Sequence, residues 1–176
     1  RSYAMRRELL GASNVSVARA EHNWGRALWA AGDRDAGLRH MNEALAWRRG
    51  GLPPDHPDTS ASLVQIGRAE RERGRLAAAR ASLDEGLAMQ RRLWPKGHFR
   101  IVETLAEATL LEVAARDASA CLRRVEEGGV MLAAIPAAPV SAARLQIAKG
   151  HCLALAGRLE PAQAALTAGA AALAPQ

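Results

Sequence analysis

Small residues stand at fixed intervals along the chain, and larger apolar residues lie between them at helical spacing. Two glycines seven residues apart occur three times, as Gly25 and Gly32, as Gly67 and Gly74, and as Gly150 and Gly157. The first two pairs are 42 residues apart, and a further step of 42 gives Thr109 and Arg116. Two more sets of small positions follow, namely Gly37, Ala79, Cys121 and Ala162, and then Ala44, Gly86, Gly128 and Gly169.

Such a repeat predicts helical hairpins stacked into a solenoid, in which no hairpin buries its apolar face alone. Small residues on two antiparallel helices let the axes approach, so that ridges of one helix enter grooves of the other. Larger apolar residues then fill the space: Trp24, Leu28, Leu38, Met41 and Leu45 in the first hairpin, and Ile66, Leu76, Leu83 and Leu87 in the second. Trp24 and Trp47 occupy repeating apolar positions, so we expect both in the core.

The pattern divides the chain into four repeats, residues 16–57, 58–98, 99–140 and 141–176, of which the third is degenerate. Residues 1–15 are expected to be the end of a preceding repeat helix and a loop, with more repeats upstream in the full protein. Asp33 is predicted to cap the second helix of the first repeat, and Pro57 to lie in the first turn of the next helix. The third turn, Ala115 to Asp117, lacks glycine, so we expect it to be less tight.

These features resemble the tetratricopeptide repeat (TPR) in its long, kinesin-light-chain type. The resemblance rests on the small positions, on the turns Gly32-Asp33, Gly74-Arg75 and Gly157-Arg158, and on Asp55-His56-Pro57-Asp58 with Ala46-Trp47-Arg48-Arg49. It covers nearly the whole chain. It implies an all-α, right-handed α-solenoid of antiparallel helix pairs, whose first helices line a concave groove that binds peptides or partner helices.

Helical geometry predicts which side chains face this groove. They are Arg19, His22, Asn23, Arg26 and Trp29 in the first repeat, Gln65, Arg68 and Arg71 in the second, Glu103, Glu107 and Leu110 in the third, and Arg144 and His151 in the fourth. The resemblance implies that Asn23 and its near-substitute Gln65 contact the backbone of a bound peptide, and Glu107 departs from that pattern. Trp29 is either an exposed aromatic anchor or a residue at the seam between repeats.

The arginines of the first two repeats have two interpretations. Guanidinium groups pair bidentately with carboxylates, so these side chains are able to hold an acidic ligand. The arginines concerned are Arg19, Arg26, Arg68 and Arg71. The alternative is solvation or pairing inside the array, and the candidate partners are Glu21, Glu70, Glu72 and Glu103.

The formal net charge is +6 and the pI about 10.5, so an acidic protein or nucleic acid must be considered as a partner. Against nucleic acid, Glu72, Glu103 and Glu107 interrupt the basic surface, and aromatic residues, at 3% of the chain, are too few to provide stacking platforms. Only Lys96 and Lys149 are lysines, which together with the many alanines indicates a GC-rich bacterial genome.

No nucleophile-elbow, Walker-type or dinucleotide-binding motif is present in the sequence, so we expect neither enzyme activity nor a cofactor. None of the five histidines has the spacing of a metal site, and we predict no metal. His56 and His98 lie 42 residues apart in equivalent connectors, which predicts a structural role near a helix start.

The two cysteines, Cys121 and Cys152, lie at small or apolar helix positions, and we expect them to be reduced and buried, as is usual in the cytosol. The long uncharged run from Gly128 to Ala143 contains Pro136 and Pro139, which makes it too short and too broken to span a membrane. We therefore predict a cytoplasmic location.

Taken together, the residues and the resemblance predict a non-catalytic scaffold that binds a partner peptide or helix, acidic in character, in the groove. The alternative is a regulatory or sensor segment of a larger bacterial protein, such as a serine/threonine kinase or a transcription regulator. Self-association through the open terminal repeats is a further hypothesis.

Overall fold

The computed structural model describes residues 15–174, which form eight α-helices and no strand. The helices are α2 (Val15–Ala30), α3 (Arg34–Gly51), α4 (Pro57–Glu72), α5 (Leu76–Leu93), α6 (Phe99–Ala114), α7 (Ala118–Ala134), α8 (Pro139–Leu155) and α9 (Leu159–Leu173). The helix predicted before residue 15 lies outside the described residues. Within residues 15–174, no helix combines the length and the apolar character needed to pass through a bilayer.

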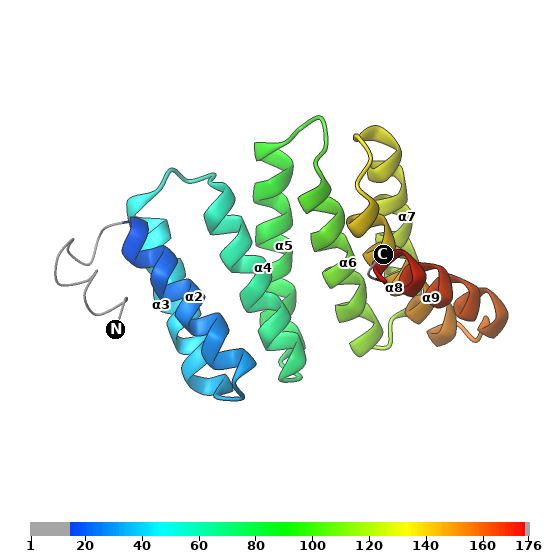
Figure 1. Cartoon of the computed structure of the whole chain (residues 1–176), viewed down its shortest axis with the longest axis horizontal. Helices are drawn as coiled ribbons and strands as arrows, with labels where there is room; N and C mark the ends of the chain where they lie inside the picture. The colour runs from blue at the N-terminus through cyan, green and yellow to red at the C-terminus, as the bar shows by residue number, and fades with distance from the viewer. Residues whose placement is uncertain (1–14, 175–176) are drawn as a thin grey trace.

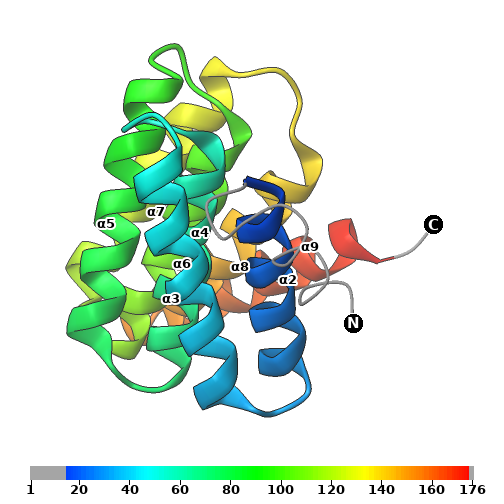
Figure 2. The same cartoon turned by 90° about the vertical axis from the view of Figure 1, so that its left-hand side faces the viewer.

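Consecutive helices pack as antiparallel pairs, α2 with α3, α4 with α5, α6 with α7, and α8 with α9, and each pair contacts the next. Figure 1 shows the pairs following one another along the long axis of the molecule, from α2 and α3 at one end to α8 and α9 at the other. Figure 2 looks along the stack from the α2 end. The fold is the all-α solenoid of helix pairs that the sequence predicts.

The small positions of the repeat are buried where helices meet. They are Gly37, Ala44, Ala79, Gly86, Cys121, Gly128, Ala162 and Gly169. A Cβ on Gly169 would lie 2.7 Å from Ile147 Cγ1, and one on Gly67 would lie 2.7 Å from Leu83 Cγ. Carbon atoms in contact are normally about 3.5 to 4.0 Å apart. The prediction that small residues permit close helix contact is therefore confirmed.

Apolar side chains join neighbouring repeats into shared clusters. Met41 of α3 packs in one cluster with Leu63 of α4, and Leu87 of α5 packs in another with Leu105 of α6. All four side chains are at most 2% exposed. Burying one such side chain is worth about 2 kcal/mol relative to leaving it in water. Each hairpin thus depends on its neighbours for part of its core.

The third turn is as tight as the others, so the prediction of a looser turn is wrong. Arg116 has φ 59°, and it takes the left-handed conformation that Gly32, Gly74 and Gly157 adopt in the other three turns. Its N–H donates to the carbonyl of Val113 at 3.0 Å, as Gly74 N–H donates to the carbonyl of Arg71 at 2.9 Å. The turn therefore keeps the left-handed geometry, although a side chain in this conformation lowers stability by about 1 to 2 kcal/mol.

The predicted helix starts are confirmed. Asp33 Oδ1 accepts from Ala36 N–H at 3.2 Å, and Pro57 is the first residue of α4. His56 Nδ1 accepts from Asp58 N–H at 3.0 Å, and His98 Nδ1 accepts from the N–H two residues later at 3.2 Å. The two connector histidines are N-caps, each satisfying one of the N–H groups that have no partner in the first turn of a helix.

The expectation that Trp24 lies in the core is wrong, because Trp24 is 49% exposed. A helix turns by about 100° per residue. Gly25 faces α3, so Trp24, one residue earlier, points about 100° away from α3. Trp24 therefore lies at the edge of the buried side of α2. Trp47 is partly buried.

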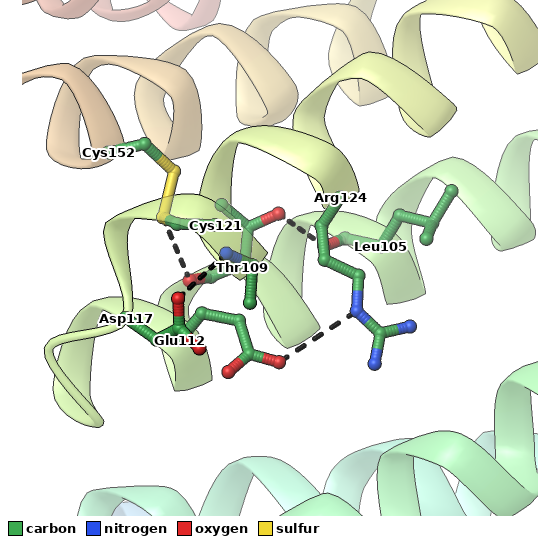
Figure 3. Close-up of a disulfide and its surroundings, with 8 residues drawn as sticks. Leu105, Thr109, Glu112, Asp117, Cys121, Arg124 and Cys152 are labelled. Atoms are coloured by element: carbon green, nitrogen blue, oxygen red, sulfur yellow. Dashed lines mark hydrogen bonds and ion pairs between the residues drawn. A yellow bond between two sulfur atoms is a disulfide. The ribbon is translucent and has the colours of Figure 1, made fainter.

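Cys121 of α7 and Cys152 of α8 form a disulfide, which Figure 3 shows among the neighbouring helices. Both cysteines are buried as predicted, at 0% exposed, but the prediction that they are reduced is wrong. Their Cα atoms are 5.6 Å apart, within the usual range for a disulfide. The bond fastens the last helix pair to the third, and it removes the reason for inferring a cytosolic location from free thiols.

Candidate binding groove

The predicted groove residues lie on α2, α4, α6 and α8, and we call the side of these helices that carries them the groove face. Side-chain contacts connect the four helices in order: Trp29 of α2 with Glu72 of α4, Arg71 of α4 with Glu107 of α6, and Glu103 of α6 with Arg144 of α8. The structure therefore brings predicted residues from all four repeats, His22 excepted, onto one continuous face.

A hollow of about 190 Å³ opens on this face between α2 and α4. Its lining residues are Arg26, Trp29, Ala30, Met41, Gln65, Arg68 and Ala69, and four of them were predicted as groove residues. The hollow exists because α2 and α4 are not in extensive contact, whereas α6 and α8 pack closely through residues such as Ala106 and Ala148. The first two repeats consequently offer the more open part of the groove.

Trp29 lies at the seam between the first two repeats and forms one wall of the hollow. Its indole Nε1 donates to Glu72 Oε2 at 3.1 Å, and Arg34 stacks over the ring at 5.6 Å from its centre. The partly buried ring also packs on the cluster that contains Met41. Of the two predicted roles, the seam position is the one observed, and the exposed part of the ring faces the hollow.

Arg68 and Arg71 have partners within the array. Arg68 Nε donates to Glu72 Oε1 at 2.9 Å, and Arg68 Nη1 is 3.9 Å from Glu107 Oε1. Arg71 Nη2 is 3.4 Å from Glu107 Oε2. Burial by itself raises the pKa of Glu72, but hydrogen bonds from Arg68 and Trp29 and the nearby positive charges outweigh it and hold that pKa below its usual value. These two arginines thus show the pairing inside the array that the second interpretation expects.

Arg19 and Arg26 differ from them, since both are exposed and neither has a carboxylate partner in residues 15–174. Asn23, between them on α2, is exposed as well, and Gln65 of α4 is partly buried in the wall of the hollow. Among the predicted groove residues, the two arginines without a carboxylate partner thus both lie on α2.

The far end of the groove is nearly neutral. Arg144 Nη1 donates to Glu103 Oε1 at 3.0 Å, and Glu107 is occupied by the two arginines of α4. Leu110 is partly exposed and His151 is exposed. This half therefore offers a ligand mainly apolar contacts and one imidazole.

The prediction that His22 faces the open groove is wrong, because its side chain is buried at 6% exposed. His22 Nδ1 lies 3.4 Å from Ser62 Oγ, and Arg48, itself 5% exposed, hydrogen-bonds to the same hydroxyl. Burial, with the charges of Arg48 and Arg26, lowers the pKa of His22 to about 4. The imidazole is neutral near pH 7 and belongs to the interface between α2, α3 and α4.

Sequence reasoning missed two buried polar groups in this interface. Arg48 donates to the backbone carbonyl of Asp58 at 2.9 Å and so ties α3 to the start of α4. Glu21, a predicted partner for a groove arginine, instead has its Oε1 2.6 Å from His40 Nδ1. The position 42 residues later holds another buried polar residue, Gln90, so both repeats bury a polar side chain at the same place.

A tetratricopeptide repeat family model matches residues 1–92. Among solved structures, one similar to this chain is a single-substitution variant of the nearly identical TPR-like repeats of a Podosopora anserina protein assigned as a kinesin light chain. It superposes with a TM-score of 0.79 at 19% identity, and the match covers 97% of this chain and 81% of that one. The same repeats without that substitution give 0.77. BtubC (BKLC) from P. vanneervenii gives 0.77 at 12% identity, over 89% of this chain and 63% of that one. No curated protein matches the sequence. At these identities the structural likeness shows the fold alone.

Proposed function

Since the chain belongs to the tetratricopeptide repeat family, we propose that it is a non-catalytic scaffold that binds an acidic peptide segment of a partner protein at the hollow between α2 and α4. The fold supports protein binding in general terms. One observation carries the finer proposal: Arg26 lines the hollow, is exposed, and has no carboxylate partner in the part of the chain that the structure describes.

Each wall of the hollow has a function in this proposal. Arg26 pairs with a ligand carboxylate, an interaction that gains strength from bidentate geometry. Gln65 offers its amide to the peptide backbone, and Trp29, held by its hydrogen bond to Glu72, provides an apolar surface that does not have to be ordered on binding. Arg19, about two turns before Arg26 on α2, extends the basic surface along the ligand.

The arrangement of charges on the opposite helices favours a peptide over nucleic acid. Several arginines of α3, α5 and α7 are paired with carboxylates of neighbouring repeats, as in Arg49 with Glu85 and Arg92 with Asp55. A surface on which several cations are already neutralised is a poorer match for a phosphate backbone, which is bound through many unpaired cations.

The division into repeats at residues 16–57, 58–98, 99–140 and 141–176 and self-association through the terminal repeats are parts of the same proposal. A peptide held mainly by the first two repeats leaves the terminal repeats available for contacts with further copies or with neighbouring segments.

The experiment is fluorescence anisotropy with a panel of labelled acidic peptides, each matched by a peptide in which Asp and Glu are replaced by Asn and Gln. We expect the acidic member to bind more tightly, and Arg26→Glu to weaken its binding by at least about tenfold, a change of about 1.4 kcal/mol. Arg39→Glu is the matched control, because Arg39 is exposed on α3, outside the hollow. Equal binding by the parent and Arg26→Glu, or equal binding of acidic and amide peptides, would overturn the proposal.

A further inference from the structure

Three side chains able to bind a metal ion gather between α2 and α3, outside the hollow. They are Glu21, His40 and Glu43, and one ligand atom of each lies within 4.8 Å of the others. Glu21 Oε1 is 2.6 Å from His40 Nδ1, and Glu43 Oε2 is 3.9 Å from the same nitrogen. An imidazole nitrogen therefore lies close to two carboxylates from two different helices.

Glu21 is unusual for its position in the repeat. Its side chain is 0% exposed, and its second oxygen, Oε2, is buried without a hydrogen-bond partner. The positions 42 and 84 residues later hold Leu63 and Leu105, at 1% and 0% exposed. A carboxylate in a leucine position costs much more free energy to bury than leucine does, unless a cation or hydrogen bonds compensate it. One oxygen of Glu21 is left for such a cation.

Glu43 also departs from its counterparts in the repeat. Glu85 and Glu127, at the same position in the next two repeats, each pair with an arginine of the preceding repeat, Arg49 and Arg91. In residues 15–174 no arginine pairs with Glu43, and the basic group beside it is His40. Ser82 is the counterpart of His40 in the next repeat, so the three residues occur together only in the first described hairpin.

Although the sequence spacing predicts no metal, we propose that Glu21, His40 and Glu43, which the fold brings together, bind one divalent transition-metal ion, with Zn²⁺ as the best match. Imidazole nitrogen and carboxylate oxygen are zinc ligands, at about 2.0 to 2.2 Å from the metal. Two carboxylates balance the double charge of the ion, and the exposed side of Glu43, whose side chain is 46% exposed, provides access for the ion and for water ligands. The metal would fasten α2 to α3 and compensate the buried charge of Glu21.

Metal binding requires only a small movement of two ligand atoms. His40 Nδ1 and Glu21 Oε1 are 2.6 Å apart. Ligand atoms at about 2.0 to 2.1 Å from a tetrahedral zinc ion are about 3.3 to 3.4 Å from one another, so the two atoms separate by about 0.7 Å on binding.

The test is a zinc titration of the full chain in competition with a chromogenic chelator, with Tm followed in parallel. We expect one high-affinity ion per chain, a Tm that rises with zinc, and a loss of at least about tenfold in affinity in His40→Asn and in Glu43→Gln. Glu43→Gln changes a half-exposed side chain, so folding is expected to survive, and circular dichroism checks this. Glu85→Gln, the same position one repeat later, is the matched control and should bind zinc like the parent.

Two results would overturn the proposal. In one, the parent shows no stoichiometric zinc binding and no rise in Tm. In the other, zinc binds with the same stoichiometry and affinity in the His40→Asn and Glu43→Gln variants, which would place the ion on an unrelated side chain such as the exposed His151. Peptide binding at Arg26 is measured separately, so either proposal can fail without the other.

Discussion

Gly25 of α2 and Gly37 of α3 approach so closely that a Cβ on Gly25 would lie 2.7 Å from the carbonyl oxygen of Gly37. The obstacle is backbone, which cannot rotate away as a flexible side chain would. The contact fixes how α2 meets α3, and therefore where Arg26 and Trp29 stand at the edge of the hollow. The absence of a side chain at Gly25, one of the repeated small positions, thus permits the helix contact that shapes the groove face.

We predict that Gly25→Ala lowers the free energy of unfolding by about 1 to 3 kcal/mol, the usual cost of overpacking a tight contact. Urea denaturation measures this. Gly129→Ala is the matched control, because Gly129 lies inside α7 and a Cβ there meets nothing within 4 Å. That substitution should instead stabilise by about 0.5 to 1 kcal/mol, since alanine favours a helix over glycine. Equal effects at the two positions would contradict the close-contact interpretation.

At the third turn, replacing a larger residue with glycine should increase the stability of the protein. Arg116→Gly removes the side chain from a left-handed residue at φ 59° and restores the glycine of the other three turns. We expect a gain of about 0.5 to 1 kcal/mol, because the relief of backbone strain exceeds the greater freedom of glycine in the unfolded chain. Arg123→Gly, at an exposed position inside α7, should lose about 1 kcal/mol in the same denaturation experiment. A loss at Arg116 would show that the turn is not strained.

Much of the fold follows from the sequence because it depends on local spacing. The small positions, the caps at Asp33, His56 and His98, and the helix pairs all repeat at a constant interval, so each is specified within one hairpin or at its junction. The candidate site follows in part for the same reason, since the first helix of each repeat brings its predicted residues to one face.

The predictions that proved wrong concern side-chain contacts between repeats, and these contacts depend on the angle at which one hairpin meets the next. The spacing alone does not tell that His22 is covered by α4 through Ser62, or that Cys121 meets Cys152 across a separation of 31 residues. Nor does it show that Arg68 and Arg71 reach Glu107 on α6. Long polar side chains at the edge of a predicted face are able to turn toward a neighbouring repeat, and here several do.

The disulfide between Cys121 and Cys152 should stabilise the C-terminal part of the stack. A cross-link closing a loop of 31 residues is worth about 3 to 4 kcal/mol, chiefly by restricting the unfolded chain. Reduction with a phosphine is expected to lower Tm and to increase hydrogen exchange in α8 and α9 more than in α2 and α3. The double variant Cys121→Ala, Cys152→Ala should show the lower Tm without responding to reductant. Two thiols titrating in denaturant without any reductant would contradict the disulfide itself.

The buried histidine makes stability depend on pH in a definite direction. The pKa of His22 is about 4 in the folded chain, lowered by burial and by the charges of Arg48 and Arg26, whereas in the unfolded chain it takes its ordinary value of 6.5. Below pH 6.5 the unfolded chain therefore binds a proton that the folded chain refuses. Stability from this group is complete above about pH 6.5 and is lost as the pH falls toward 4, by on the order of 3 kcal/mol in total.

Urea denaturation of the parent and of His22→Gln at pH 7 and pH 4.5 isolates this contribution, since the other titrating groups are common to both. We expect His22→Gln to be less stable than the parent at pH 7, because the packing beside Ser62 and Arg48 is disturbed. Its further loss on acidification should be smaller than that of the parent by roughly 2 to 3 kcal/mol. Parallel losses in the two proteins would mean that His22 is protonated equally easily in the folded and unfolded chains, and hence that α4 does not cover it in solution.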